Sequence, residues 1–150
     1  MSKRSEPSTE EFISNSSEET RAWGKKLAQR LGDWACILLV GNLGAGKTTL
    51  VKGIAEELGI DPNAVTSPTF VLIREHYGRI RLIHADAYRA ASTKEFIEVG
   101  LAEYLEQPGI VVIEWGEKLA ELVPAHAIWI RIEILDGTRR RISLSRDGRA

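Results

Sequence analysis

The chain is poor in the features that mark secreted, membrane-bound or nucleic-acid-coating proteins. It has one cysteine, Cys36, so an intramolecular disulfide is excluded, and the apolar residues around it predict a buried thiol. No apolar stretch is long enough to span a bilayer, and the polar, acidic N-terminus lacks the apolar core of a signal peptide. The net charge of −1 argues against general attraction to nucleic acid or anionic membranes. We therefore expect a cytoplasmic protein with no membrane partner.

What the sequence does contain is the composition of one ordinary globular domain. Its 150 residues are 43% hydrophobic and 27% charged, which is enough to bury a core. Residues 1–13 are rich in Ser and Glu and predict a flexible N-terminal arm. We expect residues 14–150 to form a single domain, because they contain no internal repeat, low-complexity tract or linker.

The spacing of apolar residues predicts helices alternating with strands. One helix is expected to begin at Ser16 or Ser17 and to end before Gly32. Further helices are predicted at about 47–58 and 92–105, and strands at 34–40, 71–77, 79–86, 110–113, 128–135 and 139–145. Two of these strands are apolar throughout, as in parallel sheets, and Asp136-Gly137 predicts a hairpin. The pattern predicts a three-layer α/β sandwich with a mainly parallel central sheet and antiparallel hairpin strands.

Residues Gly41 to Thr48 match the P-loop pattern G-x-x-x-x-G-K-S/T, between a predicted strand and a predicted helix. Glycines allow successive backbone N–H groups to point at phosphate oxygens, and the following helix presents the positive end of its dipole. Lys47 can reach the β- and γ-phosphates, and the Thr48 hydroxyl can ligate Mg²⁺. The fold class is therefore of the P-loop NTPase type, with ATP as the expected ligand.

A P-loop needs a carboxylate near the metal, usually at the end of a neighbouring parallel strand. Glu114 follows the apolar run 110–113 and is the first candidate, although an aspartate is usual there. Asp86 ends another apolar run and is the second candidate. The alternatives are a solvated acid at a strand end for Glu114 and a turn residue for Asp86.

Five stretches, in order and spacing, resemble the bacterial TsaE (YjeE) family across roughly residues 14–145. They are Ser17-Glu18-Glu19-Thr20, Gly41 to Thr49, Thr66-Ser67-Pro68-Thr69-Phe70, His84-Ala85-Asp86-Ala87-Tyr88-Arg89 and Glu114-Trp115. A P-loop alone occurs in many families. The Ser-Pro-Thr-Phe and His-x-Asp-x-Tyr-Arg elements together are what make the resemblance specific.

The resemblance implies a small ATPase required for N6-threonylcarbamoyladenosine at position 37 (t6A37) of tRNAs that read ANN codons. In that family the protein acts in a complex with TsaB and TsaD. TsaD transfers the threonylcarbamoyl group, and Mg²⁺-dependent hydrolysis of ATP to ADP and phosphate supports repeated turnover. Contact with tRNA is expected only through the complex. From the residues alone, the prediction stops at a Mg²⁺-dependent NTP hydrolase or kinase.

The resemblance also assigns roles to individual residues. Phosphate binding falls to Gly44, Ala45, Gly46, Lys47, Thr48 and Thr49. Mg²⁺ would be ligated by Thr48 and Glu114. Asp86 matches an acid important for hydrolysis, which we expect to orient water or to complete the outer metal shell. Lys47, Asp86 and Glu114 are thus the expected catalytic residues.

Other matching positions surround the expected nucleotide. Thr66 to Thr69 match a mobile loop near the γ-phosphate, comparable to a GTPase switch segment. Thr20 matches a position near the adenine. Trp115 would lie beside the nucleotide, with simple core packing as the alternative.

The chain departs from the family pattern after the first P-loop glycine and after Glu-Trp. Asn42 replaces a common aspartate and is expected to point away from the phosphates, and Gly116 replaces a common proline and is expected to loosen the local loop. The run Arg139 to Arg141 is interpreted either as a solvated strand face or as a contact with the base, a partner or tRNA. Arg89 is a candidate arginine finger.

Three hypotheses remain open at this stage. The first is the partner-dependent ATPase. The second is a small-molecule P-loop kinase, which is disfavoured because no arginine-rich lid lies between the P-loop and Glu114. The third is a nucleotide-dependent binding module whose hydrolysis is incidental. The absence of an Asn-Lys-x-Asp motif favours ATP over GTP.

Overall fold

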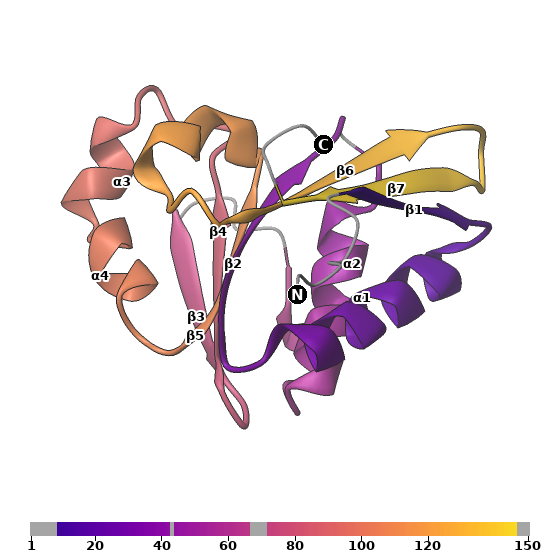
Figure 1. Cartoon of the computed structure of the whole chain (residues 1–150), viewed down its shortest axis with the longest axis horizontal. Helices are drawn as coiled ribbons and strands as arrows, with labels where there is room; N and C mark the ends of the chain where they lie inside the picture. Colours follow the sequence, from indigo (N-terminus) through magenta and orange to yellow (C-terminus); the bar gives the residue numbers. More distant parts are fainter. Residues whose placement is uncertain (1–8, 43, 67–71, 147–150) are drawn as a thin grey trace, which may run out of the picture.

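The computed structural model describes residues 9–42, 44–66 and 72–146, and these contain a single seven-stranded sheet in the order β1-β7-β6-β2-β5-β4-β3 (Figure 1). The strands are β1 (Thr9–Ser14), β2 (Trp34–Val40), β3 (Ile73–Tyr77), β4 (Arg81–Asp86), β5 (Gly109–Glu114), β6 (Ile128–Ile134) and β7 (Arg140–Ser145). The α-helices are α1 (Ser17–Leu31), α2 (Lys47–Glu57), α3 (Lys94–Glu98) and α4 (Leu101–Leu105), with 3₁₀ segments η1 (Pro62–Ala64) and η2 (Gly116–Leu122).

The centre of the sheet is parallel, as predicted. β5 pairs in parallel with both β2 and β4, and β2 also pairs in parallel with β6. The hairpins β3–β4 and β6–β7 are antiparallel and sit toward the two edges. This order brings the carboxyl ends of β4, β5 and β2 side by side.

Two apolar cores lie on opposite faces of the sheet, because side chains alternate along each strand. On β2, Ile37 and Leu39 join the core beneath α1 and α2, whereas Cys36 and Leu38 join the core beneath α3, α4 and η2. Figure 1 shows the two pairs of helices on either side of the sheet. The predicted three-layer sandwich is confirmed. Burial in the second core raises the pKa of the Cys36 thiol to about 12.

The helices α1 and α2 cross closely through two glycines. A Cβ built on Gly53 would collide with the backbone carbonyl of Arg21, and one built on Gly24 would collide with that of Leu50. Both positions therefore require glycine, because the backbones of α1 and α2 approach each other too closely for a side chain. The contact fixes α2, and with it the loop that precedes α2, against the first helix.

Two predictions about elements were wrong in detail. The flexible arm was expected to include residues 9–13, but Thr9 to Ser14 form β1, an antiparallel edge strand that pairs with β7; the rest of the expected arm lies outside the described residues. The expected helix over 92–105 is broken into α3 and α4 at Gly100, whose φ of 86° is left-handed and ends a right-handed helix.

The remaining α-helices and strands lie close to the ranges that the sequence predicted, whereas η1 and η2 were not predicted. Ser16 caps α1 by accepting a hydrogen bond from the backbone N–H of Glu19, and Gly32 follows the helix end with φ 74°. Within the described ranges, no helix is long and apolar enough to cross a membrane.

Candidate nucleotide-binding site

The P-loop joins the end of β2 to the start of α2, where parallel strands of an open sheet usually present their ligand sites. Gly46 has φ 109°, a left-handed conformation that only glycine adopts without strain. Gly41 is required for another reason, since a Cβ there would collide with the backbone carbonyl of Ile132 on β6. Leu43, the third residue of the loop, lies outside the described residues.

The first turn of α2 has the properties of an anion site. Its cap residue, Gly46, offers no side chain, and the described first turn contains no acidic residue. The N–H groups of Lys47, Thr48 and Thr49 have no intrahelical acceptor, because the first turn of any helix leaves its donors free. These donors and the positive end of the dipole fit a phosphate group.

Lys47 is buried beside this helix start, with 5% of its surface exposed. Its Nζ donates to the carbonyl oxygens of Gly41 and Asn42, at 2.5 and 3.0 Å. Burial lowers the pKa of Lys47, while the negative charges of Glu114, Asp86 and Glu117 act against that shift. A cation held at the positive end of a helix is favourable only next to negative charge, which a phosphate would supply.

The structure brings Thr48 and Glu114, the two expected Mg²⁺ ligands, into contact. The Thr48 hydroxyl donates to Glu114 Oε2 at 3.0 Å, and Glu114 is 3% exposed. These two oxygens fit Mg²⁺, which prefers hard oxygen ligands and takes the remainder of its shell from phosphates and water. The described residues contain no cluster of three or more acidic, histidine or cysteine side chains. A Mg²⁺ ion bound together with a nucleotide does not need such a cluster, because phosphates and water supply most of its ligands.

The same Glu114 oxygen contacts a fully buried histidine. His84 Nε2 lies 2.7 Å from Glu114 Oε2, a hydrogen bond in which an ionised carboxylate can only be the acceptor. Asp86, two residues further along β4, stands opposite Glu114 in the strand register. Asp86 Oδ1 accepts a hydrogen bond from the N–H of Tyr88 at 2.9 Å. The two candidate acids therefore end adjacent strands at one edge of the sheet.

Trp115 packs on the core, which was one of the two interpretations offered for it, and it also contacts the P-loop lysine. Among the described residues other than glycine, Trp115 is the one with a left-handed backbone conformation, at φ 58°. Its ring is partly buried against the core beneath α3. The ring centroid lies 4.5 Å from Lys47 Nζ and 4.9 Å from the ring of Tyr88. Trp115 is thus a core residue that also covers the P-loop lysine.

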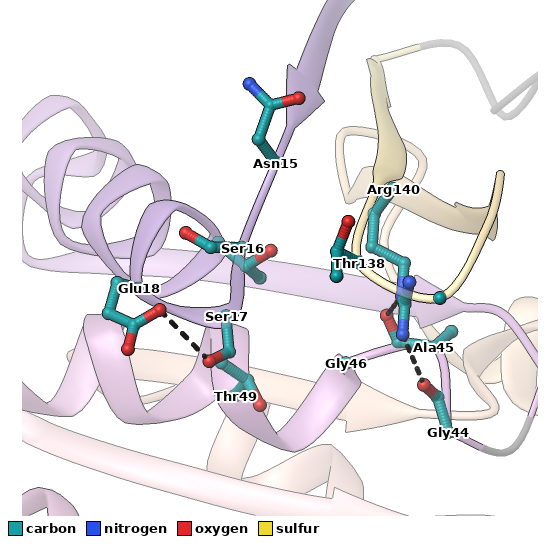
Figure 2. A pocket seen from close by; sticks show the side chains of 12 residues that line it. Asn15, Ser16, Ser17, Glu18, Gly44, Ala45, Gly46, Thr49, Thr138 and Arg140 are labelled. Atoms are coloured by element: carbon teal, nitrogen blue, oxygen red, sulfur yellow. Dashed lines mark hydrogen bonds between the residues drawn. The ribbon is translucent and has the colours of Figure 1, made fainter.

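A cavity of about 360 Å³ opens between the start of α1, the P-loop and the turn joining β6 to β7 (Figure 2). Thr20 lines it, with its hydroxyl 2.7 Å from that of the buried Ser14. The other lining residues are Asn15, Ser16, Ser17, Glu18, Gly44, Ala45, Gly46, Thr49, Gly137, Thr138 and Arg140. The cavity adjoins the anion site and has room for a nucleoside.

Comparisons with known proteins show the family of this chain. The family model described as "Threonylcarbamoyl adenosine biosynthesis protein TsaE" matches residues 14–142. This chain belongs to the TsaE family. A protein of Treponema pallidum named "tRNA threonylcarbamoyladenosine biosynthesis protein TsaE" is 38% identical over 133 residues, covering 89% of this chain and 98% of that protein.

Two further matches cover most of the molecule. The Bacillus subtilis protein named "tRNA threonylcarbamoyladenosine biosynthesis protein TsaE" is 38% identical, over 87% of this chain and 82% of its own length. A crystal structure of Bacillus subtilis YdiB superposes with a TM-score of 0.76 at 31% identity, covering 93% of this chain and 86% of that one. The sequence resemblance to the TsaE family is therefore confirmed.

Some positions of the TsaE pattern fall away from this cluster or outside the described residues. Arg89 is exposed after β4, and Thr66 is exposed before the segment 67–71, which lies outside the described residues. Asn42 is exposed. Gly116 is buried so closely on Leu38 that a Cβ there would lie 2.6 Å from that side chain, so close packing is a reason for glycine at this position.

Two contacts of this TsaE-family site were not predicted. His84 belongs to a matching motif, but nothing in the sequence gave its partner. Arg140 donates to P-loop carbonyls, whereas its neighbours Arg139 and Arg141 pair with Asp136 and Glu133. Strand alternation could have separated them, because Arg140 shares the face of the buried residues 142 and 144.

Proposed function

We propose that this chain binds ATP with Mg²⁺ and hydrolyses it to ADP and phosphate, as the ATPase that supports formation of t6A37 in tRNA. One observation carries the proposal: the uncapped start of α2, the buried Lys47 and the Thr48–Glu114 pair converge at the carboxyl ends of adjacent strands. Family membership and the names of the relatives support the choice of pathway.

Each residue would then act on a defined part of the nucleotide. The backbone of Gly44 to Thr49 and the Lys47 ammonium would hold the phosphates. Thr48 and Glu114 would hold Mg²⁺, which when bound neutralises the charge that develops on the phosphate oxygens. The cavity beside Thr20 would receive the nucleoside.

Hydrolysis would proceed by in-line attack of water on the γ-phosphate. Asp86 is the residue best placed to orient that water, because it ends the strand beside Glu114. Lys47 would stabilise the charge of the transition state. Arg89, the candidate arginine finger, is exposed after β4, and the guanidinium of Arg140 donates to P-loop carbonyl oxygens. We therefore expect slow hydrolysis until a partner completes the site.

The partner proposed is the complex of TsaB and TsaD, with tRNA reached through that complex. The net charge of −1 supports an indirect contact, because direct binding to the tRNA backbone requires clustered positive charge. The same role places the protein in the cytoplasm, where tRNA is modified.

Phosphate release from ATP and from GTP tests this function, using the purified chain alone and with TsaB and TsaD. We expect weak release from ATP, little from GTP, an increase with the partners and loss in Lys47→Ala. Release that the partners do not change would leave a nucleotide site but contradict the proposed role in t6A synthesis.

A further inference from the structure

Arg140, at the start of β7, forms hydrogen bonds with the outside of the P-loop. Its Nε donates to the carbonyl oxygen of Ala45 at 3.0 Å, and Nη2 donates to that of Gly44 at 3.3 Å (Figure 2). Its Nη1 donates to the carbonyl oxygens of Asp136 and Arg139, at 2.9 and 3.0 Å. One guanidinium therefore connects two successive P-loop peptides to the turn between β6 and β7.

Because the peptide bond is planar, these hydrogen bonds from Arg140 also fix the direction of the neighbouring N–H groups. In a trans peptide the C=O and the following N–H point in opposite directions. Carbonyls of Gly44 and Ala45 held outward on Arg140 therefore turn the N–H groups of Ala45 and Gly46 toward the inside of the loop. The Ala45 N–H indeed donates to the Asn42 carbonyl at 3.1 Å, and that carbonyl also accepts from Lys47 Nζ inside the loop.

The two peptide planes held by Arg140 are next to glycines, which allow a peptide plane to rotate. Gly44 and Gly46 flank Ala45, with φ values of 80° and 109°. Glycine populates both signs of φ about equally, so these peptide planes could rotate and present carbonyls to the phosphate instead. A phosphate would be repelled by a carbonyl oxygen in that position.

We propose that Arg140 is a positioning residue that presets the P-loop for phosphate, by fixing two peptide planes with their N–H groups inward. This role rests on the proposed nucleotide binding at the same loop. It also makes the β6–β7 turn part of the phosphate site, although that turn contributes no P-loop residue.

The adjacent arginines supply matched controls, since they carry the same charge on the same strand or turn. Arg139 Nε pairs with Asp136 Oδ2 at 2.7 Å, and Arg141 Nη1 pairs with Glu133 Oε1 at 3.2 Å. Both pairs are exposed. Replacing either arginine removes one positive charge near the turn and leaves the bonds from Arg140 to the P-loop in place.

Calorimetric titration with ATP–Mg²⁺ and with pyrophosphate tests the proposal, on the full chain and its Arg140→Ala, Arg140→Lys, Arg139→Ala and Arg141→Ala variants. We expect Arg140→Ala to weaken binding of both ligands about tenfold, the effect of losing charge-assisted hydrogen bonds that order the loop. Arg140→Lys should recover part of the affinity, because an ammonium can reach one carbonyl but not both. The two control variants should stay within about twofold of the unaltered chain.

Amide hydrogen exchange without nucleotide provides a second readout. The exchange rates of the Ala45 and Gly46 amides should rise in Arg140→Ala. The same rates should stay unchanged in the two control variants. Unaltered affinity and exchange in Arg140→Ala, or tighter binding, would overturn the proposal. Loss of ATP binding with pyrophosphate binding intact would also overturn it, because Arg140 would then contact the nucleoside directly. If the unaltered chain bound no nucleotide, the proposed function itself would fail.

Discussion

At the scale of single residues, one carboxylate oxygen organises the metal side of the site. Glu114 Oε2 accepts from the Thr48 hydroxyl on α2 and from His84 Nε2 on β4, at 3.0 and 2.7 Å. These donors come from two different elements, and His84 and Glu114 are both buried. The orientation of the expected Mg²⁺ ligand is therefore fixed before any nucleotide binds.

The buried pair predicts a cost for replacing the histidine. In His84→Phe, Glu114 loses a donor where water has little access, and the free energy of unfolding should fall by about 2 kcal/mol. Urea denaturation measures the change, and His126→Phe, at an exposed position, serves as the control. A stability equal to that of the unaltered chain would mean that the His84–Glu114 contact does not stabilise the fold.

The residues of the site differed in how well the sequence revealed them. Lys47, Thr48 and Glu114 were predictable, because the P-loop pattern and an apolar strand ending in an acid locate them by local rules. The contacts of His84 and Arg140 were not, because they join residues 30 and 95 positions apart. Such contacts depend on strand order and register, which no local pattern specifies.

At the scale of elements, the crossing of α1 and α2 determines where the phosphate-binding end of α2 lies. Gly24 and Gly53 bring the two backbones together over the sheet. An alanine normally stabilises a helix by about 1 kcal/mol relative to glycine, so a loss of stability at these positions would be informative.

Gly53→Ala should lower the free energy of unfolding by about 2 kcal/mol, because its new methyl group collides with the Arg21 carbonyl and forces the helices apart. The melting temperature and the urea midpoint measure the effect. Lys26→Ala, on the exposed face of α1, should leave both nearly unchanged. A stabilised Gly53→Ala variant would contradict the close crossing.

Elements were predicted well where their cause is local. The caps of α1 and the apolar run of β2 were sufficient to place both. β1 was missed because two of its six residues are Glu and few are apolar; pairing with β7 rather than apolar content makes it a strand. The break at Gly100 was not predicted, because the apolar spacing continues across it while the left-handed φ of 86° ends the helix there.

At the scale of the whole molecule, the fold gathers the site from segments far apart in the sequence. The P-loop, the ends of β4 and β5, the start of α1 and the β6–β7 turn converge around one end of α2. The parallel centre of the sheet accounts for this, because parallel strands end on the same side. The turn of the β6–β7 hairpin then adds one wall of the cavity.

The central claim is that this convergence binds ATP and cleaves it through Glu114. The most direct test is phosphate release by Glu114→Gln at saturating ATP and Mg²⁺, with ATP binding measured on the same preparation. Our account predicts that ATP still binds, while release falls about 100-fold because the neutral amide is a weaker Mg²⁺ ligand than the carboxylate. Release at the rate of the unaltered chain would contradict the role of Glu114. Continued tRNA modification by a variant that binds but does not cleave ATP would instead favour a nucleotide-dependent switch.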